Sequence, residues 1–494
     1  MLSLILLIFV LCLSLAYILA DVRKPKGYPP GPIWLPLVGC YPYLKKLHLK
    51  KKYLHLAGSV LHEIYGPVVG LKLGFDKVVL VSGYKGFKEI CGNEYFDGRP
   101  DGLFFRLRSF GERLGVVFVD GPFRHEQKKF TMNVLRKLGY GSHPMHDIIV
   151  REVQELVKII ESNCEEPFQI NNLFDMHALN VIWTLLAGYR FSSDDKRLPK
   201  LLELVHKVFQ TAEISGGVIN QMPFLKYIAP DLSSYNILAN FFDEMMSFLQ
   251  DIVNKHNPAD DQNFISIFSK KIRENDGMKD TPFTKKQLLV TLQDLFMAGT
   301  ETTSNTLVFA AYHLIKNPQV QKKIHAELDR EMGTDEIPTM EHRNRLIYLE
   351  ATIMEVLRIS SLVPLTLPHK ALRTEKLMGY TIPKDTILLP SIWSVHMDEK
   401  YWKDPHEFCP DRFIDENGKI IQHSHFMPFG TGRRKCLGEV LAKTSLFIFL
   451  AVLLKKFELQ SPVNDLSVEV IEGVTLTLAP FKIKFTPRHL PSEM

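Results

Sequence analysis

A glycine-rich loop near the carboxyl end carries the residues with the clearest chemical potential. Residues 429–438 read F-G-T-G-R-R-K-C-L-G and lead into an apolar helix expected from Glu439 to about Leu454. Cys436 stands just before that helix, where backbone N–H groups and neighbouring cations favour the thiolate over the thiol. A thiolate in a rigid loop meets the needs of an axial iron ligand, and Arg434 is placed to pair with an anionic cofactor group.

Two alternatives remain open for Cys436 on these residues alone. A lone cysteine in a glycine-rich turn is commonly a buried packing residue. A zinc site is the other alternative, because Cys409, His423 and His425 are nearby in the sequence. Their spacing matches no structural zinc pattern, which disfavours zinc.

A second group of polar residues interrupts the longest apolar helix pattern of the chain. The pattern predicts a helix over 284–316, and its centre reads A-G-T-E-T-T at 298–303. A carboxylate and three hydroxyls are costly in a buried helix unless each is paired or the site is wet and functional. Gly299 weakens the helix and Thr302 can bond back to the carbonyl of Ala298, so we expect the helix to open into a small groove.

The composition is that of a folded protein and excludes several other classes. The chain has 494 residues, 46% of them apolar and 23% charged, with 29 Gly and 29 Pro, which excludes collagen-like and disordered proteins. The net charge is only +5 and no basic-aromatic repeat occurs, so nucleic acid is not an expected partner. The 6 cysteines lie far apart without a CxxC pair, which indicates a reducing compartment and no disulfide framework.

Hydrophobic patterning predicts one large, mainly α domain with minor β sheets. Between about 150 and 330 the pattern is almost wholly helical, broken by prolines. No internal repeat or domain-length linker divides the chain. Short strands are expected at 68–73, 77–81, 376–382, 386–389, 474–478 and 481–485.

The amino end predicts a membrane anchor. Residues 2–20 are all apolar or small, and about 19 helical residues span roughly 28 Å, close to a bilayer core. A cleaved signal peptide is the alternative, but no cation precedes the run and Ile18 breaks the small-residue pattern of a cleavage site. The basic residues at 23–26 favour a cytoplasmic position for the rest of the chain. The expected organisation is an anchor over 1–21, a basic and proline-rich linker over 22–32 and a catalytic domain over 33–494.

Four short motifs follow one another along the chain. Residues 298–303 stand first, followed by E-x-x-R at Glu355 and Arg358, P-x-R-F at 410–413 and F-x-x-G-x-R-x-C-x-G at 429–438. An E-x-x-R pair alone is weak, since an exposed i,i+3 pair contributes only about 0.3 to 0.5 kcal/mol. The four together resemble the cytochrome P450 family of haem-thiolate monooxygenases, and the resemblance covers nearly the whole chain.

The resemblance implies the cytochrome P450 fold, a single large domain that wraps haem b. Cys436 would be the thiolate ligand of the iron, which excludes its role as a simple packing residue. Thr302 and Glu301 would deliver protons to dioxygen, so that one oxygen atom enters the substrate and the other leaves as water.

Further positions match residues that brace or bind the haem in that family. Glu355, Arg358 and Arg412 would form a buried charge network behind the ligand loop. The haem contacts implied by the resemblance are Arg434, His369, Arg99, Arg124, Lys128, Phe429 and Gly430. Two of these depart from the family's usual residues, because Arg124 stands in place of a tryptophan and Lys128 in place of an arginine. Both can neutralise a propionate, although lysine lacks the bidentate fork of arginine.

The resemblance also implies an electron donor and a lipophilic pocket. Electrons would come from NADPH through a separate NADPH–cytochrome P450 reductase at the endoplasmic reticulum membrane, docked on a basic face. Candidates for that face are Lys128, Lys129, Arg433, Lys435 and Lys443. Candidates for the pocket are Phe118, Phe296, Ala298, Leu362, Leu365, Val474 and Thr475. Any one of these apolar stretches alone is more often core packing.

Within the family, the segments 29–32, 110–118 and 126–130 are similar to those of microsomal insect members. Their sequences are most similar to those of the juvenile-hormone epoxidases, which act on farnesoic acid or methyl farnesoate. A free acid would need a cation at the pocket, and the candidates are Arg106, Arg108 and Arg113.

Other functions remain open. One is a monooxygenase that hydroxylates steroids, fatty acids or xenobiotics. Another is a haem-thiolate isomerase or ligand carrier that uses no oxygen, which the Glu301–Thr302 pair disfavours because such a protein needs no proton relay. A third is a membrane-anchored scaffold without haem, which the complete loop around Cys436 disfavours.

Overall fold

The computed structural model describes residues 2–488, except for 165, 193, 214–215, 257–261, 279–280 and 334–335. Within these residues the fold is mainly helical with four small sheets. The mainly α class with minor β structure is therefore confirmed.

The elements follow in chain order. The first helices are α1 (Leu2–Asp21), α2 (Tyr41–Lys51), α3 (Leu54–Tyr65), α4 (Tyr84–Gly92), η1 (Glu94–Phe96), α5 (Leu103–Leu107), α6 (Gly121–Lys137), α7 (His143–Glu161), α8 (Asp175–Ala187), α9 (Arg197–Thr211), α10 (Gly217–Gln221), α11 (Leu225–Ile228), α12 (Tyr235–Lys255) and α13 (Phe264–Glu274). They continue as α14 (Lys285–Lys316), α15 (Pro318–Glu331), η2 (Met340–Asn344), α16 (Ile347–Ser360), α17 (Trp393–His396), η3 (Pro410–Phe413), η4 (Gly432–Arg434) and α18 (Glu439–Lys456). The strands are β1 (Val68–Leu73), β2 (Asp76–Val81), β3 (Phe168–Gln169), β4 (His369–Lys370), β5 (Glu375–Leu377), β6 (Tyr380–Ile382), β7 (Ile387–Pro390), β8 (Phe457–Gln460), β9 (Val470–Ile471), β10 (Thr477–Leu478) and β11 (Lys482–Pro487).

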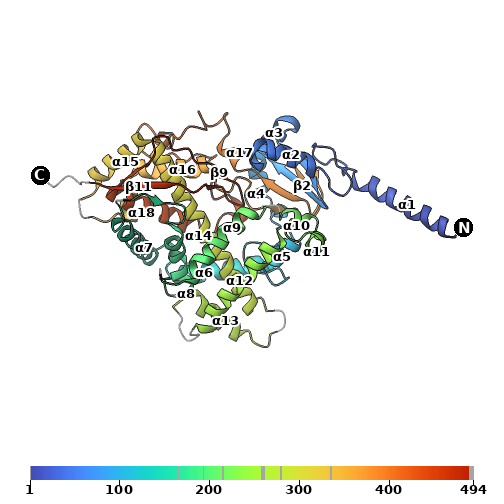
Figure 1. Ribbon diagram of the computed structural model, residues 1–494, viewed down its shortest axis with the longest axis horizontal. Helices are drawn as coiled ribbons and strands as arrows, with labels where there is room; N and C mark the ends of the chain where they lie inside the picture. Colours follow the sequence, from blue (N-terminus) through green and yellow to red (C-terminus); the bar gives the residue numbers. More distant parts are fainter. Residues whose placement is uncertain are drawn as a thin grey trace.

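The largest sheet supports one candidate site residue. Its strand order is β1-β2-β7-β4, with β2 parallel to β7 and the other two pairs antiparallel. His369 begins β4 and pairs with Leu388 of β7. The sheet, with α2 and α3 beside it, lies at the end of the body from which α1 projects (Figure 1). It therefore fixes the backbone of His369 from the side opposite the helical core.

The long helix α14 passes through the helical part of the molecule (Figure 1). It begins after Thr284, whose Oγ1 accepts a hydrogen bond from the backbone N–H of Gln287 at 3.1 Å. It ends at Lys316, because Pro318 cannot donate a hydrogen bond to the preceding turn and instead begins the next helix, α15. The predicted helix over 284–316 is thus confirmed. Residues 298–303 are assigned to the α-helix without a break, so the predicted opening into a groove stays a prediction.

Gly299 allows two helices to pack closely. A Cβ atom on Gly299 would lie 2.9 Å from Cγ2 of Ile182 in α8, which is too close for two carbon atoms. The side-chain oxygen of Thr302 donates to the carbonyl of Ala298 at 2.8 Å, as predicted. This local bond satisfies the hydroxyl without breaking the backbone ladder.

Helix α1 projects from the body as a single helix, and its free end lies far from the carboxyl end (Figure 1). At its inner end Asp21 pairs with Lys72 of β1 at 2.5 Å and accepts a hydrogen bond from the N–H of Leu37 at 2.8 Å. Among the described residues, no helix reaches the length and hydropathy needed to cross a membrane. The anchor expected over 1–21 therefore stays a prediction.

Candidate active site

The ligand loop, residues 429–438, is held in shape by its own backbone and by the end of α4. The N–H of Cys436 donates to the carbonyl of Phe429 at 2.9 Å, which closes the loop on itself. Gly432 adopts φ +70°, and a Cβ atom there would lie 2.0 Å from the carbonyl oxygen of Cys91. Only glycine fits this contact, so the loop is seated on α4 without room for a side chain.

The Cys436 thiol is exposed, yet enough protein atoms surround it to change its acidity. Burial raises the pKa of the thiol, and the backbone N–H of Gly438 opposes this only in part. The expectation that the loop alone favours the thiolate is therefore wrong. A coordinated metal ion deprotonates a thiol outright, so the metal would create the thiolate.

One face of α14 is uncovered at the centre of the helix. Ala298 is exposed and Thr302 is half-buried, although the residues from Thr303 to Ala311 are all buried. Residues four apart on a helix share a face. This open face and the exposed thiol of Cys436 are surfaces against which a flat, apolar group can lie.

The buried Arg99 and the half-buried Arg434 lie beside the ligand loop and bond to backbone carbonyls. Arg99 donates from Nη1 to the carbonyl of Pro368 at 2.6 Å, and Arg434 donates from Nε to the carbonyl of Asp97 at 2.8 Å. Burial lowers the pKa of Arg434 to about 8 and that of Arg99 to about 10, and repulsion from neighbouring guanidinium groups adds to both shifts. These depressed pKa values indicate an excess of positive charge that an anion would relieve.

The first half of α6 adds two more cations to this cluster. Arg124 donates to the carbonyl of Arg433 at 2.8 Å, and Lys128 reaches the same oxygen at 3.4 Å. The Nε of Arg124 is buried and has no hydrogen-bond partner within the described part of the chain. Arg99, Arg124 and Arg434 together, hereafter the arginine cluster, form a cationic rim that suits a group carrying carboxylates.

His369 lies next to the arginine cluster as a neutral imidazole. Its Nδ1 is 2.8 Å from the carbonyl oxygen of Phe96 and must donate, because a carbonyl only accepts. Burial, followed by repulsion from Arg99, lowers the pKa of His369 to about 3. A propionate contact therefore requires His369 to gain a second proton at Nε2.

Glu301 does not lie with Thr302. Its carboxylate is fully buried, with Oε2 at 2.5 Å from Nδ1 of His206 and Oε1 accepting a hydrogen bond from Asn305 at 2.8 Å. The hydroxyl of Thr475 is 3.4 Å from the same Oε1. Thr302 faces the uncovered side of α14, so the two residues proposed for proton delivery are adjacent in sequence but directed differently.

The three residues of the expected charge network meet behind the ligand loop. Arg358 forms two hydrogen bonds with Glu355, at 2.7 and 2.8 Å, and both side chains are fully buried. Arg412 donates from Nε to Glu355 at 3.1 Å. A bidentate pair that excludes water is far stronger than the exposed pair considered from sequence.

His396 connects this network to the ligand loop. Its carbonyl accepts a hydrogen bond from Nη1 of Arg358 at 2.8 Å, and its Nε2 accepts one from the N–H of Met427 at 3.2 Å. Met427 precedes Phe429 by two residues. The network therefore holds the entrance of the loop through a single imidazole ring.

The pocket candidates occupy different surroundings. Phe296 is fully buried and packs edge-on against Trp183 of α8 at 5.8 Å and Phe248 of α12 at 6.3 Å. It lies on a different side of α14 from Ala298, since residues two positions apart in the sequence are rotated by about 200° around the helix axis. Phe296 is thus a core residue and is not carried into the proposed pocket.

Other candidates lie on segments that α14 and its neighbours hold in place. Asp294 accepts hydrogen bonds from the N–H groups of Val116 and Val117 at 2.7 and 3.1 Å, which positions the half-buried Phe118. The carbonyl of Leu362 accepts a hydrogen bond from the N–H of Leu476 at 2.8 Å. This bond joins the segment after α16 to the segment that carries Val474 and Thr475, whereas Leu365 is buried against the largest sheet.

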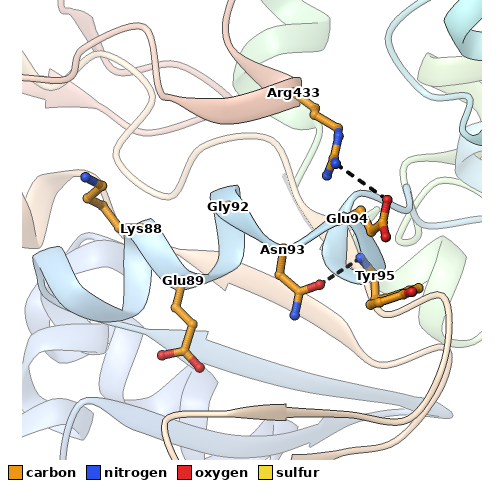
Figure 2. A pocket seen from close by; sticks show the side chains of 7 residues that line it. All are labelled: Lys88, Glu89, Gly92, Asn93, Glu94, Tyr95 and Arg433. Carbon is orange, nitrogen blue, oxygen red and sulfur yellow. Dashed lines mark hydrogen bonds and ion pairs between the residues drawn. The ribbon is translucent and has the colours of Figure 1, made fainter.

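A shallow cavity of about 480 Å³ opens on the surface beside the ligand loop. Figure 2 shows Arg433 directed toward Glu94 across its opening, and Asn93 bonded to the backbone of Tyr95. Lys88, Glu89 and Gly92 complete the lining. Its charged lining is unsuited to a lipophilic substrate, so this cavity is not the substrate pocket.

Comparison with known proteins decides the family. The family model described as cytochrome P450 matches residues 29–485. The chain belongs to the cytochrome P450 family. It is 38% identical to the farnesoate epoxidase of Bombyx mori, over 99% of both chains. It is also 35% identical to probable cytochrome P450 305a1 of Drosophila melanogaster, over 98% of this chain and 99% of the relative.

The vertebrate relatives are more distant but still cover the chain. Cytochrome P450 2U1 of Rattus norvegicus is 31% identical over 96% of this chain and 93% of the relative. The protein is thus a P450 monooxygenase, and P450 membership implies a haem-thiolate cofactor, dioxygen, a small-molecule substrate and a redox partner. The exposed thiol, the uncovered face of α14 and the cationic rim fit such a haem.

Sequence reasoning missed several residues that hold this P450 site together. His206, Asp175, His396 and Asp294 all lie in helices, and only the tertiary fold reveals their partners. A polar residue inside an apolar helix is a usable signal. Asp294, within α14, carried that signal, whereas Asp175 begins α8 and the two histidines gave none.

Proposed function

We propose that this P450 monooxygenase epoxidises a farnesoid, either farnesoic acid or methyl farnesoate, in juvenile hormone biosynthesis. The observation that carries the proposal is the 38% identity to a farnesoate epoxidase over 99% of both chains. In this reaction one atom of dioxygen enters a carbon–carbon double bond. The other leaves as water with two protons and two electrons.

Haem b would be held between the ligand loop and α14. Cys436 supplies the thiolate ligand, next to Phe429 and Gly430, and the arginine cluster with Lys128 and His369 pairs with the propionates. When bound, the haem supplies the electron chemistry that activates dioxygen. The depressed pKa of Arg434, about 8, supports this assignment because an anion would restore it.

Thr302 would take part in the proton steps from the open face of α14. Its hydroxyl donates to the carbonyl of Ala298 at 2.8 Å, which leaves its oxygen lone pairs directed to that face. Glu301 would supply the exchangeable proton from within the core. The Glu355–Arg358–Arg412 network would brace the loop and take no part in chemistry.

The three cations considered for a free acid already have carboxylate partners. Arg106 pairs with Asp101 at 2.8 Å, Arg113 pairs with Asp120 at 2.8 Å, and the buried Arg108 pairs with Asp294. A substrate carboxylate would therefore compete with an existing pair at Arg106 and Arg113. The Nη1 of Arg108 is buried and has no hydrogen-bond partner within the described part of the chain, but a carboxylate bound there would lie next to the carboxylate of Asp294. Repulsion from Asp294 favours the neutral methyl ester over the free acid.

The decisive experiment compares both farnesoids. Purified full-length protein is combined with NADPH–cytochrome P450 reductase and NADPH, and each substrate is supplied in turn. We expect epoxide from methyl farnesoate with a higher kcat/KM than from farnesoic acid. If both the epoxide and a substrate-induced change of the haem spectrum are absent, the proposed substrate is refuted. A steroid or a fatty acid serves as the comparison substrate.

The redox partner and the membrane complete the proposal. A basic face would receive NADPH–cytochrome P450 reductase. Among the candidate residues of this face, Lys435 and Lys443 pair with Glu439 at 2.5 and 2.8 Å, and Lys129 is exposed.

Residues 1–21 would anchor the protein in the endoplasmic reticulum membrane, with the linker at 22–32 and the catalytic domain in the cytoplasm. The apolar run at 2–20 supports this position. The test is carbonate extraction of membranes, in which a chain that lacks residues 2–20 is expected to be released.

A further inference from the structure

A half-buried histidine lies between Glu301 and a second carboxylate. His206 of α9 places Nδ1 at 2.5 Å from Oε2 of Glu301 in α14 and Nε2 at 2.6 Å from Oδ2 of Asp175 in α8. The other oxygen of Asp175 accepts a hydrogen bond from the hydroxyl of Ser304. Three helices thus meet in one chain of polar contacts.

The contacts define the charge of the imidazole. Nε2 of the ring is hydrogen-bonded to Asp175, and Nδ1 makes an ion-pair contact with Glu301, so both ring nitrogens face carboxylate oxygens. Burial opposes a charge on the imidazole, but the interactions with Asp175 and Glu301 outweigh burial and raise the pKa of His206 to about 10. His206 is therefore an imidazolium at neutral pH.

Among the described contacts of Glu301, only His206 can change its charge. Asn305 and Thr475 are the other hydrogen-bond partners, and neither titrates. The His206 side chain is also 16% exposed, whereas that of Glu301 is fully buried. His206 therefore controls both the orientation of the Glu301 carboxylate and its link toward solvent.

Helix α9 also contacts the segment that carries two pocket candidates. The carbonyl of Phe209, one turn beyond His206, accepts a hydrogen bond from the N–H of Val474 at 2.7 Å. A Cβ atom on Gly473 would lie 2.1 Å from the same oxygen, so α9 and this segment are in tight contact.

We propose that His206 is the positioning residue for Glu301, whose carboxylate it holds turned toward α9 and away from the face of Thr302. Asp175 and Ser304 fix the opposite edge of the ring. The proposal rests on the proposed role of Glu301 in proton delivery. Release of this ion pair lets the carboxylate turn toward the open face of α14, so His206 sets how efficiently electrons from NADPH are recovered in product.

The test uses the holoenzyme with reductase, NADPH and methyl farnesoate, or another substrate that the wild type turns over. The variants are His206→Gln, Glu301→Gln and the double variant, each normalised to the haem that binds CO after reduction. The measurements are product formed per NADPH oxidised and the solvent deuterium isotope effect on kcat. His177→Gln is the control, because His177 is a buried histidine of α8 that pairs with Glu152 at 3.2 Å and not with Glu301.

We expect His206→Gln to lower product per NADPH by about tenfold and to change the isotope effect. The Glu301 carboxylate is then free to reach the open face at every stage of turnover, so electrons are lost to reduced oxygen instead of entering product. This loss is smaller than the roughly 100-fold or more that is usual when a direct acid–base group is removed. The double variant is expected to equal Glu301→Gln, because His206 acts through Glu301. His177→Gln is expected to keep the wild-type ratio.

Each other result overturns a defined part of the argument. A wild-type ratio and isotope effect in His206→Gln, or a loss of haem content alone, overturns the positioning role. Additive losses in the double variant overturn it too, because His206 would then act independently of Glu301. A wild-type ratio in Glu301→Gln instead refutes the proton-delivery role within the proposed function.

Discussion

Arg124 occupies a position where a tryptophan is usual in this family, and its guanidinium contacts the carbonyl of Arg433 at 2.8 Å. In the protein alone it repels Arg434 and Arg99, and it adds to the lowering of both pKa values. The same charge would attract a propionate. A single residue therefore opposes folding of the haem-free protein and favours binding of the haem.

This opposition gives the first prediction. Arg124→Gln is expected to raise the thermal midpoint of the haem-free protein, because one member of a buried cationic cluster is removed. The same variant is expected to lose haem to a scavenger about tenfold faster, since a charge-assisted hydrogen bond contributes roughly 1.5 to 3 kcal/mol. Arg136→Gln, exposed on the same helix, should change neither value. A change of the same sign in both would contradict the argument.

Buried histidines give a second prediction, for the pH dependence of stability. Burial and then Arg358 lower the pKa of His313 to about 4, so the unfolded chain takes up its proton first and stability falls below about pH 6.5. His206 is shifted upward to about 10, so its contribution is full below about pH 6.5 and is lost as the pH rises to 10.

Urea unfolding of the haem-free protein at several pH values measures both limbs. His313→Phe keeps the stacking with Phe408, whose ring centre is 4.7 Å away, and should flatten the acid limb. His206→Gln should flatten the alkaline limb. An alkaline limb that persists unchanged in His206→Gln would show that other groups determine it.

At the scale of elements, the long helix and the ligand loop were predictable and their connections were not. Capping at Thr284 and the stop at Pro318 delimit α14 locally, and the loop motif identifies Cys436 directly. In contrast, the turn of Glu301 toward His206 depends on where α9 packs, more than 90 residues away in sequence. Phe296 was misplaced for the same reason, since an apolar helix gives no indication of which side faces the pocket.

The connection between α16 and the ligand loop carries a third prediction. His396→Ala leaves the N–H of Met427 without its acceptor, while the backbone carbonyl that binds Arg358 remains. An unsatisfied buried donor costs about 1 to 3 kcal/mol, so the variant should unfold at lower urea concentration. The CO-bound spectrum should also lose the band of the thiolate-ligated form. His406→Ala, an exposed neighbour, is the control.

At the scale of the whole molecule, α1 joins the catalytic body through a defined contact. The Lys72 and Asp21 side chains are only 6% and 11% exposed, and they meet at 2.5 Å. Because Asp21 also binds the N–H of Leu37, the end of α1 is held on two sides of the linker. Helix α1 and the body therefore have a fixed relative direction at this joint.

The fourth prediction concerns that joint. Lys72→Met should destabilise the full chain by about 3 to 5 kcal/mol, because Asp21 is left as an uncompensated buried charge. The double variant Asp21→Asn with Lys72→Met should recover most of this loss. Chemical unfolding in detergent measures both, and Lys50→Met, exposed on α2, serves as the control. Equal losses in the single and double variants would contradict a paired role.

The close contact between Gly432 and the backbone of Cys91 has a consequence for the gene. Every single-base change of a glycine codon that alters the amino acid introduces either a side chain with Cβ or a stop. At this codon each such residue would place Cβ 2.0 Å from a backbone oxygen, so no missense mutation of one base is tolerated without displacing α4 or the loop. Variation among alleles is therefore expected to be silent at this codon, and a missense allele here should behave as a null allele.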